Sequence, residues 1–200
     1  MTRIAILDRD ATIIDVVRDE ETGTVSVAFH PEQLRLLPGA IEGMRTLQDF
    51  GFLLCIATNQ PGPAKGQFSV EAVTRTNRAL TERLTHQGVR IAAIEVCMHH
   101  PAGGPGGDPS LLQSCECRKP KPGMLNALVQ RFGATRADSW MIGDSASDIE
   151  AGHSAGLRTG LLFSPNRCEL CPMRFAVPAP VPDAHGATLL ELAGVIMRGG

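Results

Sequence analysis

The sequence contains no long uninterrupted apolar run, and its charges of opposite sign nearly cancel. The N-terminal stretch is apolar only in short bursts, which are interrupted by charged residues at Arg3, Asp8, Arg9, Asp10 and Asp15. We therefore expect neither a signal-peptide core nor a membrane span there, and a cytoplasmic location is the expected default. A formal net charge of -2 provides no basic surface for a polyanion, so we expect no nucleic-acid partner.

The sequence also has no evident internal repeat, and 200 residues leave little room for two independent domains. Its hydrophobic fraction of 43% and charged fraction of 20% are typical of a folded chain with a substantial core. We expect one domain over residues 1–200. Two Gly- or Pro-rich stretches, 101–117 and 164–183, are expected to lie outside the sheet and its helices. They fall within an expected loop insertion at 97–117 and an expected C-terminal insertion at 164–185.

Short apolar runs alternate with helical stretches, which is typical of a parallel sheet covered by helices on both faces. The sequence predicts strands at 3–7, 52–57, 91–98, 139–142 and 157–163. It predicts helices at 40–50, 69–87, 122–132, 146–155 and 187–197. The segment 18–29 contains ETGTV, which predicts a hairpin turn. We thus expect an α/β protein with a doubly wound, mainly parallel sheet.

Residues suited to phosphate chemistry follow four of the predicted strands. Loops at the carboxyl ends of parallel strands converge on a crevice, so these side chains are expected to meet. They are Asp8 and Asp10, Thr58 and Asn59, Lys119, and Asp144 and Asp148. Carboxylates bind a hard cation such as magnesium, while a lysine and a hydroxyl position a phosphoryl group. The pattern predicts phosphoryl transfer, although any one pair by itself is also compatible with a strand end, a turn or a helix cap.

Asp8 and Asp10 are two apart in an extended segment, so they are expected to project to the same side, with the intervening Arg9 turned away. One carboxylate can then attack phosphorus while the other handles a proton.

Four segments resemble the motifs of the haloacid dehalogenase superfamily, in the same order along the chain. They are LDRDAT at 7–12, ATNQ at 57–60, CRKPKPGM at 117–124 and IGDSASD at 142–148. The resemblance implies a Rossmann-like fold and a magnesium-dependent phosphatase. One departure is Ala11, where the superfamily commonly has glycine. If that position needs an unusual backbone angle, alanine strains it and lowers activity or rearranges the loop.

The resemblance also implies a role for each motif residue. Asp8 forms an aspartyl-phosphate, and Asp10 protonates the leaving oxygen and then activates water. Thr58 and Lys119 hold the phosphoryl oxygens. Magnesium is bound by the Asp8 side chain, the Asp10 backbone carbonyl and Asp144, with Asp148 as a further ligand or an orienting group.

A cluster of cysteine and histidine residues predicts a second metal. Cys97, Cys115, Cys117 and one histidine form a closed tetrahedral set, which is typical of structural zinc. From the residues alone, His99 or His100 can supply the imidazole, and the alternative without metal is a set of free thiols on a loop. A second pair, Cys168 and Cys171, lacks two further ligands, so we expect no metal there.

The zinc loop resembles one branch of the superfamily, which comprises bacterial D-glycero-D-manno-heptose 1,7-bisphosphate 7-phosphatases and the related histidinol-phosphate phosphatases. This resemblance implies no large cap domain and favours His99 as the zinc ligand. The stretch NQPGPAKG at 59–66 is more similar to the heptose enzymes. It implies substrate binding by Asn59, Gln60, Lys65 and Arg118, with Lys65 meeting a distal phosphate.

The resemblance therefore implies a monomeric phosphatase that acts on a sugar bisphosphate, in the heptose route to bacterial surface polysaccharide. Ile14 and Pro61 depart from the heptose enzymes where a sugar is met, and this leaves histidinol phosphate or another phosphomonoester open as the substrate. A phosphotransferase is a further alternative, because an acceptor other than water can intercept an aspartyl-phosphate. The alternative of another class is a catalytically weak, zinc-stabilised binding module.

Overall fold

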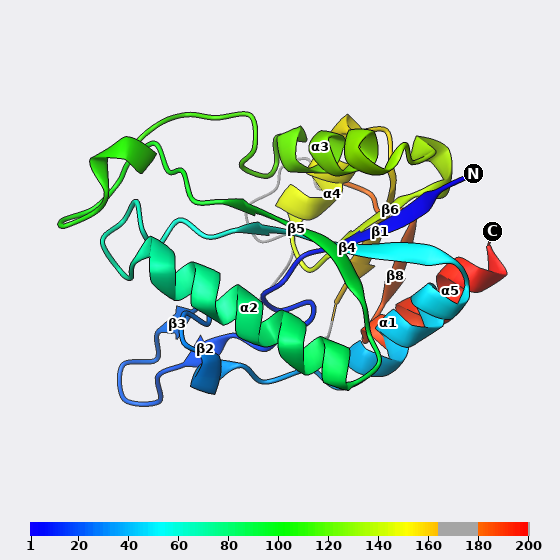
Figure 1. Cartoon of the computed structure of the whole chain (residues 1–200), viewed down its shortest axis with the longest axis horizontal. Helices are drawn as coiled ribbons and strands as arrows, with labels where there is room; N and C mark the ends of the chain where they lie inside the picture. The colour runs from blue at the N-terminus through cyan, green and yellow to red at the C-terminus, as the bar shows by residue number, and fades with distance from the viewer. Residues whose placement is uncertain (164–179, 200) are drawn as a thin grey trace.

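The computed structural model describes residues 1–163 and 180–199, and its centre is a six-stranded parallel sheet (Figure 1). The strand order is β5-β4-β1-β6-β7-β8, and every neighbouring pair is parallel. The strands are β1 (Arg3–Leu7), β4 (Phe52–Asn59), β5 (Ile91–Cys97), β6 (Trp140–Gly143), β7 (Arg158–Leu162) and β8 (Ala184–Gly186). The expected α/β class is confirmed.

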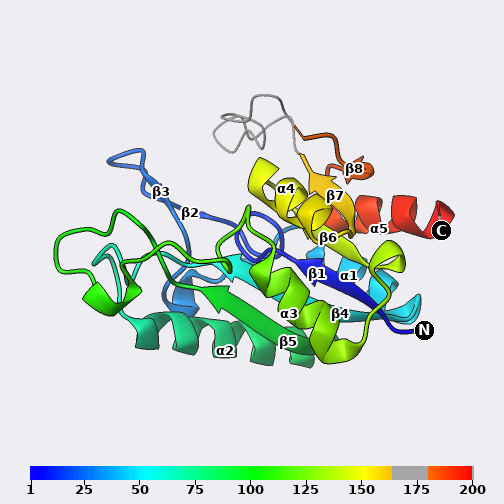
Figure 2. The same ribbon diagram turned by 90° about the horizontal axis from the view of Figure 1, so that it is seen from above.

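Helices cover both faces of the sheet (Figure 2). One face packs against α1 (Ala40–Asp49), α2 (Val70–His86) and α5 (Leu189–Arg198), and the other against α3 (Gly123–Phe132) and α4 (Ala146–Ser154). Ala5 and Leu7 of β1 point into the first core, and Ile4 and Ile6 point into the second. Because both faces of β1 are buried, its sequence is a continuous apolar run rather than an alternating one. Three short 3-10 helices connect these elements, at Pro31–Gln33, Pro109–Leu111 and Arg136–Asp138.

The five predicted strands and five predicted helices are present, with ends shifted by at most two residues. The predicted C-terminal insertion at 164–185 ends too late, because Ala184–Gly186 forms β8, a strand that the sequence did not predict, and pairs with β7. The sequence did not predict this three-residue strand because it contains no apolar run. Asp183 anchors it by accepting hydrogen bonds from the amide and the hydroxyl of Thr159, at 2.7 and 2.9 Å. The rest of that insertion, with Cys168 and Cys171, lies outside the described residues.

A small antiparallel hairpin follows β1, formed by β2 (Val17–Arg18) and β3 (Val25–Ser26). Its base is tied to the molecule by Ala28, which is buried, and by Phe29, whose ring stacks on Phe68 with 5.0 Å between ring centroids. The connection from β5 to α3, residues 98–122, contains no helix or strand other than the 3-10 helix Pro109–Leu111. The described helices are all too short or too polar to cross a membrane.

Candidate active site

Lys119 lies at the centre of a buried charge cluster at the carboxyl edge of the sheet. Its ammonium donates hydrogen bonds to Asp8 Oδ1 at 2.7 Å, to Asp148 Oδ1 at 2.6 Å and to the Ala57 carbonyl at 2.8 Å. An ammonium has three donors, so all three are used. The Lys119 side chain is 2% exposed, and two carboxylates fix its charge in place.

A third carboxylate, Asp144, completes this cluster. One carboxylate oxygen each from Asp8, Asp144 and Asp148 lies within 4.8 Å of the others. Burial raises the pKa of Asp8 to about 6, with the charges of Asp148 and Asp10 adding to the effect and Lys119 opposing it. Burial, with Asp148 and Asp8, also raises the pKa of Asp144 well above its usual range. Three close carboxylates around one ammonium leave excess negative charge, and their hard oxygen donors fit magnesium.

Local structure explains why these carboxylates meet. The end of β1 is held to β6 by the hydrogen bond from the Asp8 amide to the Ile142 carbonyl, at 2.8 Å. Asp148 caps α4 with its other oxygen, which accepts from the amide and the hydroxyl of Ser145 at 3.1 and 2.5 Å. A Cβ on Gly143 would lie 2.3 Å from Asp148 Cγ, so only glycine leaves room for this carboxylate. The same aspartate therefore serves as a helix cap and as a partner of Lys119.

Residues at the end of β4 and directly after it position several groups of the site. Asn59 exchanges two hydrogen bonds with the backbone of Lys119, at 3.0 and 3.1 Å, which fixes the loop that carries the lysine. Gln60 is fully buried, and its amide nitrogen donates to Asp10 Oδ2 at 2.7 Å and to Thr58 Oγ1 at 2.9 Å. With no surface of its own, Gln60 positions these two groups and has no direct access to a substrate.

A cavity of about 200 Å³ lies over this cluster. It is lined by Asp8, Asp10, Thr58, Asn59, Lys119, Asp144 and Asp148, which the sequence predicted, and by residues of the hairpin. Ser145 and Ser147 also line it, and their hydroxyls are 2.9 Å apart. Both serines were missed in the sequence, although they lie between two predicted site residues. They add neutral hydrogen-bonding groups beside the carboxylates.

The prediction that Arg9 turns away from the carboxylates is wrong. Its guanidinium folds back on Asp10, with Nε donating to Oδ2 at 3.0 Å and Nη2 donating to Oδ1 at 3.1 Å. Nη1 donates to Asn77 Oδ1 at 2.7 Å, and Nη2 also donates to the Ala28 carbonyl at 2.8 Å. Strand alternation sets only where the Cβ of Arg9 points, and its long side chain then reaches back to the nearest carboxylate.

Ala11 adopts the left-handed conformation, with φ of 58°. It is the only described residue other than glycine with positive φ. Its amide donates to the Ile14 carbonyl at 2.7 Å, which closes the tight turn between Asp10 and the hairpin. The position therefore has the unusual backbone angle that the glycine of the superfamily accommodates without strain.

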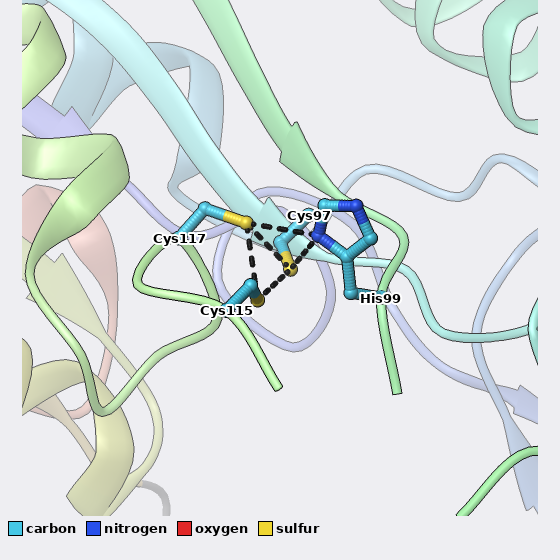
Figure 3. Close-up of side chains that lie close together, drawn as sticks. All are labelled: Cys97, His99, Cys115 and Cys117. Atoms are coloured by element: carbon cyan, nitrogen blue, oxygen red, sulfur yellow. Dashed lines mark hydrogen bonds between the residues drawn. The ribbon is translucent and has the colours of Figure 1, made fainter. Parts of the chain in front are cut away.

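The structure brings Cys97, His99, Cys115 and Cys117 together, with one ligand atom from each within 4.8 Å of the others (Figure 3). Cys117 Sγ lies 3.1 Å from Cys97 Sγ, 3.3 Å from Cys115 Sγ and 3.2 Å from His99 Nδ1. The other candidate, His100, instead accepts a hydrogen bond from the Ala102 amide at 3.1 Å.

The protonation of these thiols is uneven. Burial raises the pKa of Cys97, and burial with the neighbouring sulfurs raises that of Cys117. For Cys115, burial is outweighed by hydrogen bonds from Cys117 and the Arg118 amide, which lower its pKa to about 7. Three sulfurs and an imidazole this close fit a zinc ion, which binds thiolates and neutral imidazole.

The predicted substrate-binding cations gather beside this loop. Desolvation lowers the pKa of His100, and the positive charges of Lys65 and Arg118 lower it further, which places the three groups in one electrostatic neighbourhood. Arg118 Nη1 is buried and has no hydrogen-bond partner. The loop that carries Lys65 packs closely on the glycine-rich segment before Cys115: a Cβ on Gly104 would lie only 2.4 Å from the Lys65 carbonyl oxygen. Neither cation lines the cavity over Asp8.

Comparison with known proteins agrees with this geometry. A family profile described as "HAD-hyrolase-like" matches residues 116–164. A D-glycero-beta-D-manno-heptose-1,7-bisphosphate 7-phosphatase of Rhodopseudomonas palustris is 38% identical over 153 residues, which are 76% of this chain and 79% of the relative. The enzyme of the same name from Pasteurella multocida is 32% identical over 162 residues, which are 81% of this chain and 82% of the relative.

Solved structures share the fold over the whole chain. A D,D-heptose 1,7-bisphosphate phosphatase from B. bronchiseptica, complexed with magnesium and phosphate, has a TM-score of 0.78 at 24% identity and covers 100% of both chains. A putative HAD-like phosphatase from Mesorhizobium loti has a TM-score of 0.75 at 26% identity, over 100% of this chain and 88% of that one. The fold and the site define a phosphatase of the haloacid dehalogenase superfamily. Within that superfamily, the chain belongs to the family of the D-glycero-β-D-manno-heptose-1,7-bisphosphate 7-phosphatases.

Proposed function

We propose that this protein hydrolyses the 7-phosphate of D-glycero-β-D-manno-heptose 1,7-bisphosphate, in a magnesium-dependent reaction that passes through an aspartyl-phosphate on Asp8. The observation that carries the proposal is the contact of Lys119 Nζ with both Asp8 Oδ1 and Asp148 Oδ1, at the floor of an open cavity. The proposed substrate follows from the relatives, whose names specify this sugar, its β anomer and the 7-phosphate.

The reaction has two steps. In the first, a carboxylate oxygen of Asp8 attacks phosphorus, the bond from phosphorus to the sugar oxygen breaks, and that oxygen takes a proton from Asp10. In the second, water attacks phosphorus and gives a proton to Asp10, while the bond between phosphorus and Asp8 breaks. Inorganic phosphate leaves, and both aspartates return to their starting states. Lys119 and Thr58 bind the phosphoryl oxygens throughout.

Asp8, Asp144 and the Asp10 backbone carbonyl are the proposed magnesium ligands. Magnesium bound there would neutralise charge on the phosphoryl oxygens. Asp148 is proposed as a further ligand or as an orienting group, and its two occupied oxygens favour the second role.

Cys97, His99, Cys115 and Cys117 are the proposed structural zinc ligands. Cys117 leads directly into Arg118 and Lys119, so an ordered loop would hold both cations in place. Lys65 and Arg118 are proposed to bind the distal phosphate, supported by the cationic neighbourhood that they share with His100. The described contacts of Asn59 and Gln60 lead us to propose positioning roles for both in place of substrate binding. The monomeric state and the cytoplasmic location stay predictions.

The test is phosphate release with magnesium from both anomers of heptose 1,7-bisphosphate and from histidinol phosphate. The native chain is compared with Asp8→Asn and with Asp49→Asn, a matched change at an exposed position on α1. We expect turnover of the β anomer, its loss in Asp8→Asn and no change in Asp49→Asn. Faster turnover of histidinol phosphate than of either heptose anomer would overturn the proposed substrate assignment. Release that survives Asp8→Asn would overturn the mechanism, and no release from any ester would favour the binding module.

A further inference from the structure

We propose that Arg9 is the positioning residue of the acid–base group, holding the Asp10 carboxylate in the orientation that proton transfer requires. The inference rests on the proposed function, because it assumes that Asp10 moves protons. It concerns a residue that does not line the cavity over Asp8 and that strand alternation assigns to the other side of β1.

The contacts of Arg9 are those of a clamp. The guanidinium meets Asp10 through two different nitrogens: Nε donates to Oδ2 at 3.0 Å, and Nη2 donates to Oδ1 at 3.1 Å and also lies 2.9 Å from Oδ2. A two-pronged contact of this kind fixes the plane of the carboxylate, which a single hydrogen bond does not. The Arg9 side chain is 1% exposed and that of Asp10 is 11% exposed, so little water can substitute for the pair.

Two distant segments brace the clamp. Asn77 of α2 accepts from Nη1 at 2.7 Å, and the Ala28 carbonyl at the base of the hairpin accepts from Nη2 at 2.8 Å. The Asp10 carboxylate also accepts from Gln60 Nε2 at 2.7 Å and from the Ala28 amide at 3.4 Å. The position of Asp10 is therefore determined jointly by α2, by the hairpin and by the loop after β4.

The consequence for the reaction depends on the leaving group. A sugar oxygen is a poor leaving group and needs the proton from Asp10, whereas p-nitrophenolate leaves without one. A displacement of about 1 Å in a reacting group can cost roughly 100-fold in rate. A misplaced Asp10 should thus slow aspartyl-phosphate formation from the sugar phosphate far more than from p-nitrophenyl phosphate.

Two variants test the inference. Arg9→Gln removes the positive charge and the two-nitrogen contact with Asp10, whereas Arg9→Lys retains the charge without that contact. For Arg9→Gln we expect kcat/KM for heptose bisphosphate to fall about 100-fold and that for p-nitrophenyl phosphate to fall less than about fivefold. Arg9→Lys should restore little of the loss. The matched control is Arg78→Gln, because Arg78 is an exposed arginine on α2 that pairs with Glu82. We expect this control to leave kcat/KM unchanged for both substrates.

A double-mutant cycle separates positioning from a general structural role. In an Asp10→Asn background, Arg9→Gln should change the kcat for p-nitrophenyl phosphate by less than about twofold, because the group that Arg9 positions is already gone. If Arg9→Gln does not fold, Asn77→Ala loosens the same clamp from α2. It should show the same dependence on the leaving group with a loss of about threefold to tenfold.

Two results would overturn the inference while leaving the proposed function intact. One is an equal loss of kcat/KM on both substrates in Arg9→Gln. The other is an effect of Arg9→Gln that is as large in the Asp10→Asn background as in the native chain. Absence of magnesium-dependent turnover in the native chain would overturn both. The two failures are distinguishable, because only the first leaves a native activity that Asp8→Asn abolishes.

Discussion

Lys119 and Asp148 form the shortest ion pair of the active site, with 2.6 Å between Nζ and Oδ1, and both side chains are almost completely buried. Because Lys119 also holds Asp8, removal of this one lysine leaves two buried carboxylates without a cation. The pair therefore links the stability of the site to its chemistry.

Replacing Lys119 by alanine should lower the free energy of unfolding by about 3 kcal/mol, because breaking a buried ion pair leaves an uncompensated charge. Phosphatase activity should be lost as well. Urea denaturation without added magnesium measures the first effect. Lys121→Ala is the matched control, since Lys121 pairs with Glu116 at the solvent-exposed surface, and its loss should cost much less. Equal costs for the two variants would contradict the account.

The stability of the metal-free protein should depend on pH through Asp8. Its pKa is raised from 3.8 to about 6, mainly by burial, so the folded protein binds this proton more tightly than the unfolded chain. Stability should therefore decrease as the pH rises from about 4 to about 6. The measurement is the melting temperature without magnesium across this range, taken as the difference between the native chain and Asp8→Asn. A constant difference would show that the Asp8 pKa is not raised.

Magnesium should stabilise the protein strongly at pH 7 and weakly at pH 5. The ion needs ionised carboxylates, whereas the raised pKa values of Asp8 and Asp144 favour their protonated forms at the lower pH. Thermal melting with and without magnesium at the two pH values tests this, with Asp49→Asn as a variant that should retain the full response. An equal shift at both pH values would argue for a magnesium site elsewhere.

Ala11→Gly should stabilise the protein by about 1 kcal/mol, because φ of 58° is strained for alanine and relaxed for glycine. Turnover should rise or stay constant, since the turn beside Asp10 loses its strain. Ala79→Gly within α2 is the contrasting substitution and should destabilise by about 1 kcal/mol, as glycine does in a helix interior. Destabilisation by both would mean that Ala11 is not strained.

Removal of the proposed zinc should loosen the segment 101–117 and lower activity while magnesium binding persists. The four candidate ligands join the end of this loop to the end of β5, and Cys117 is two residues from Lys119. Metal analysis, limited proteolysis and phosphate release would be compared for the native chain, Cys115→Ser and Cys55→Ala. Cys55 lies on β4 and is buried in the core that the sheet forms with α3 and α4, so its alanine variant should keep the zinc. An unchanged proteolysis pattern in zinc-free protein would contradict the prediction.

Much of this molecule follows from short stretches of sequence. The apolar run of β1 and the periodic apolar positions of α2 predict their elements because strand and helix periodicity act over a few residues. The carboxyl edge of a parallel sheet then brings together residues that follow neighbouring strands, as Asp8 after β1 and Asp144 after β6 do. Paired Cys and His spacing likewise predicts a metal cluster, since close pairs can converge on one ion.

Tertiary packing decided what those patterns left open. The sequence by itself determined the α/β class and predicted most of the residues that line the cavity over Asp8. It also identified Ala11 as a position where an unusual backbone angle would strain alanine. The clamp of Arg9 on Asp10 depends on Asn77 and Ala28, which lie 68 and 19 residues away in the chain. The burial of Gln60 and the pairing of β8 also need partners from remote segments. Local secondary structure sets the direction of the Cα–Cβ bond. The final direction of a long side chain depends on which distant donors and acceptors the folded chain places within its reach.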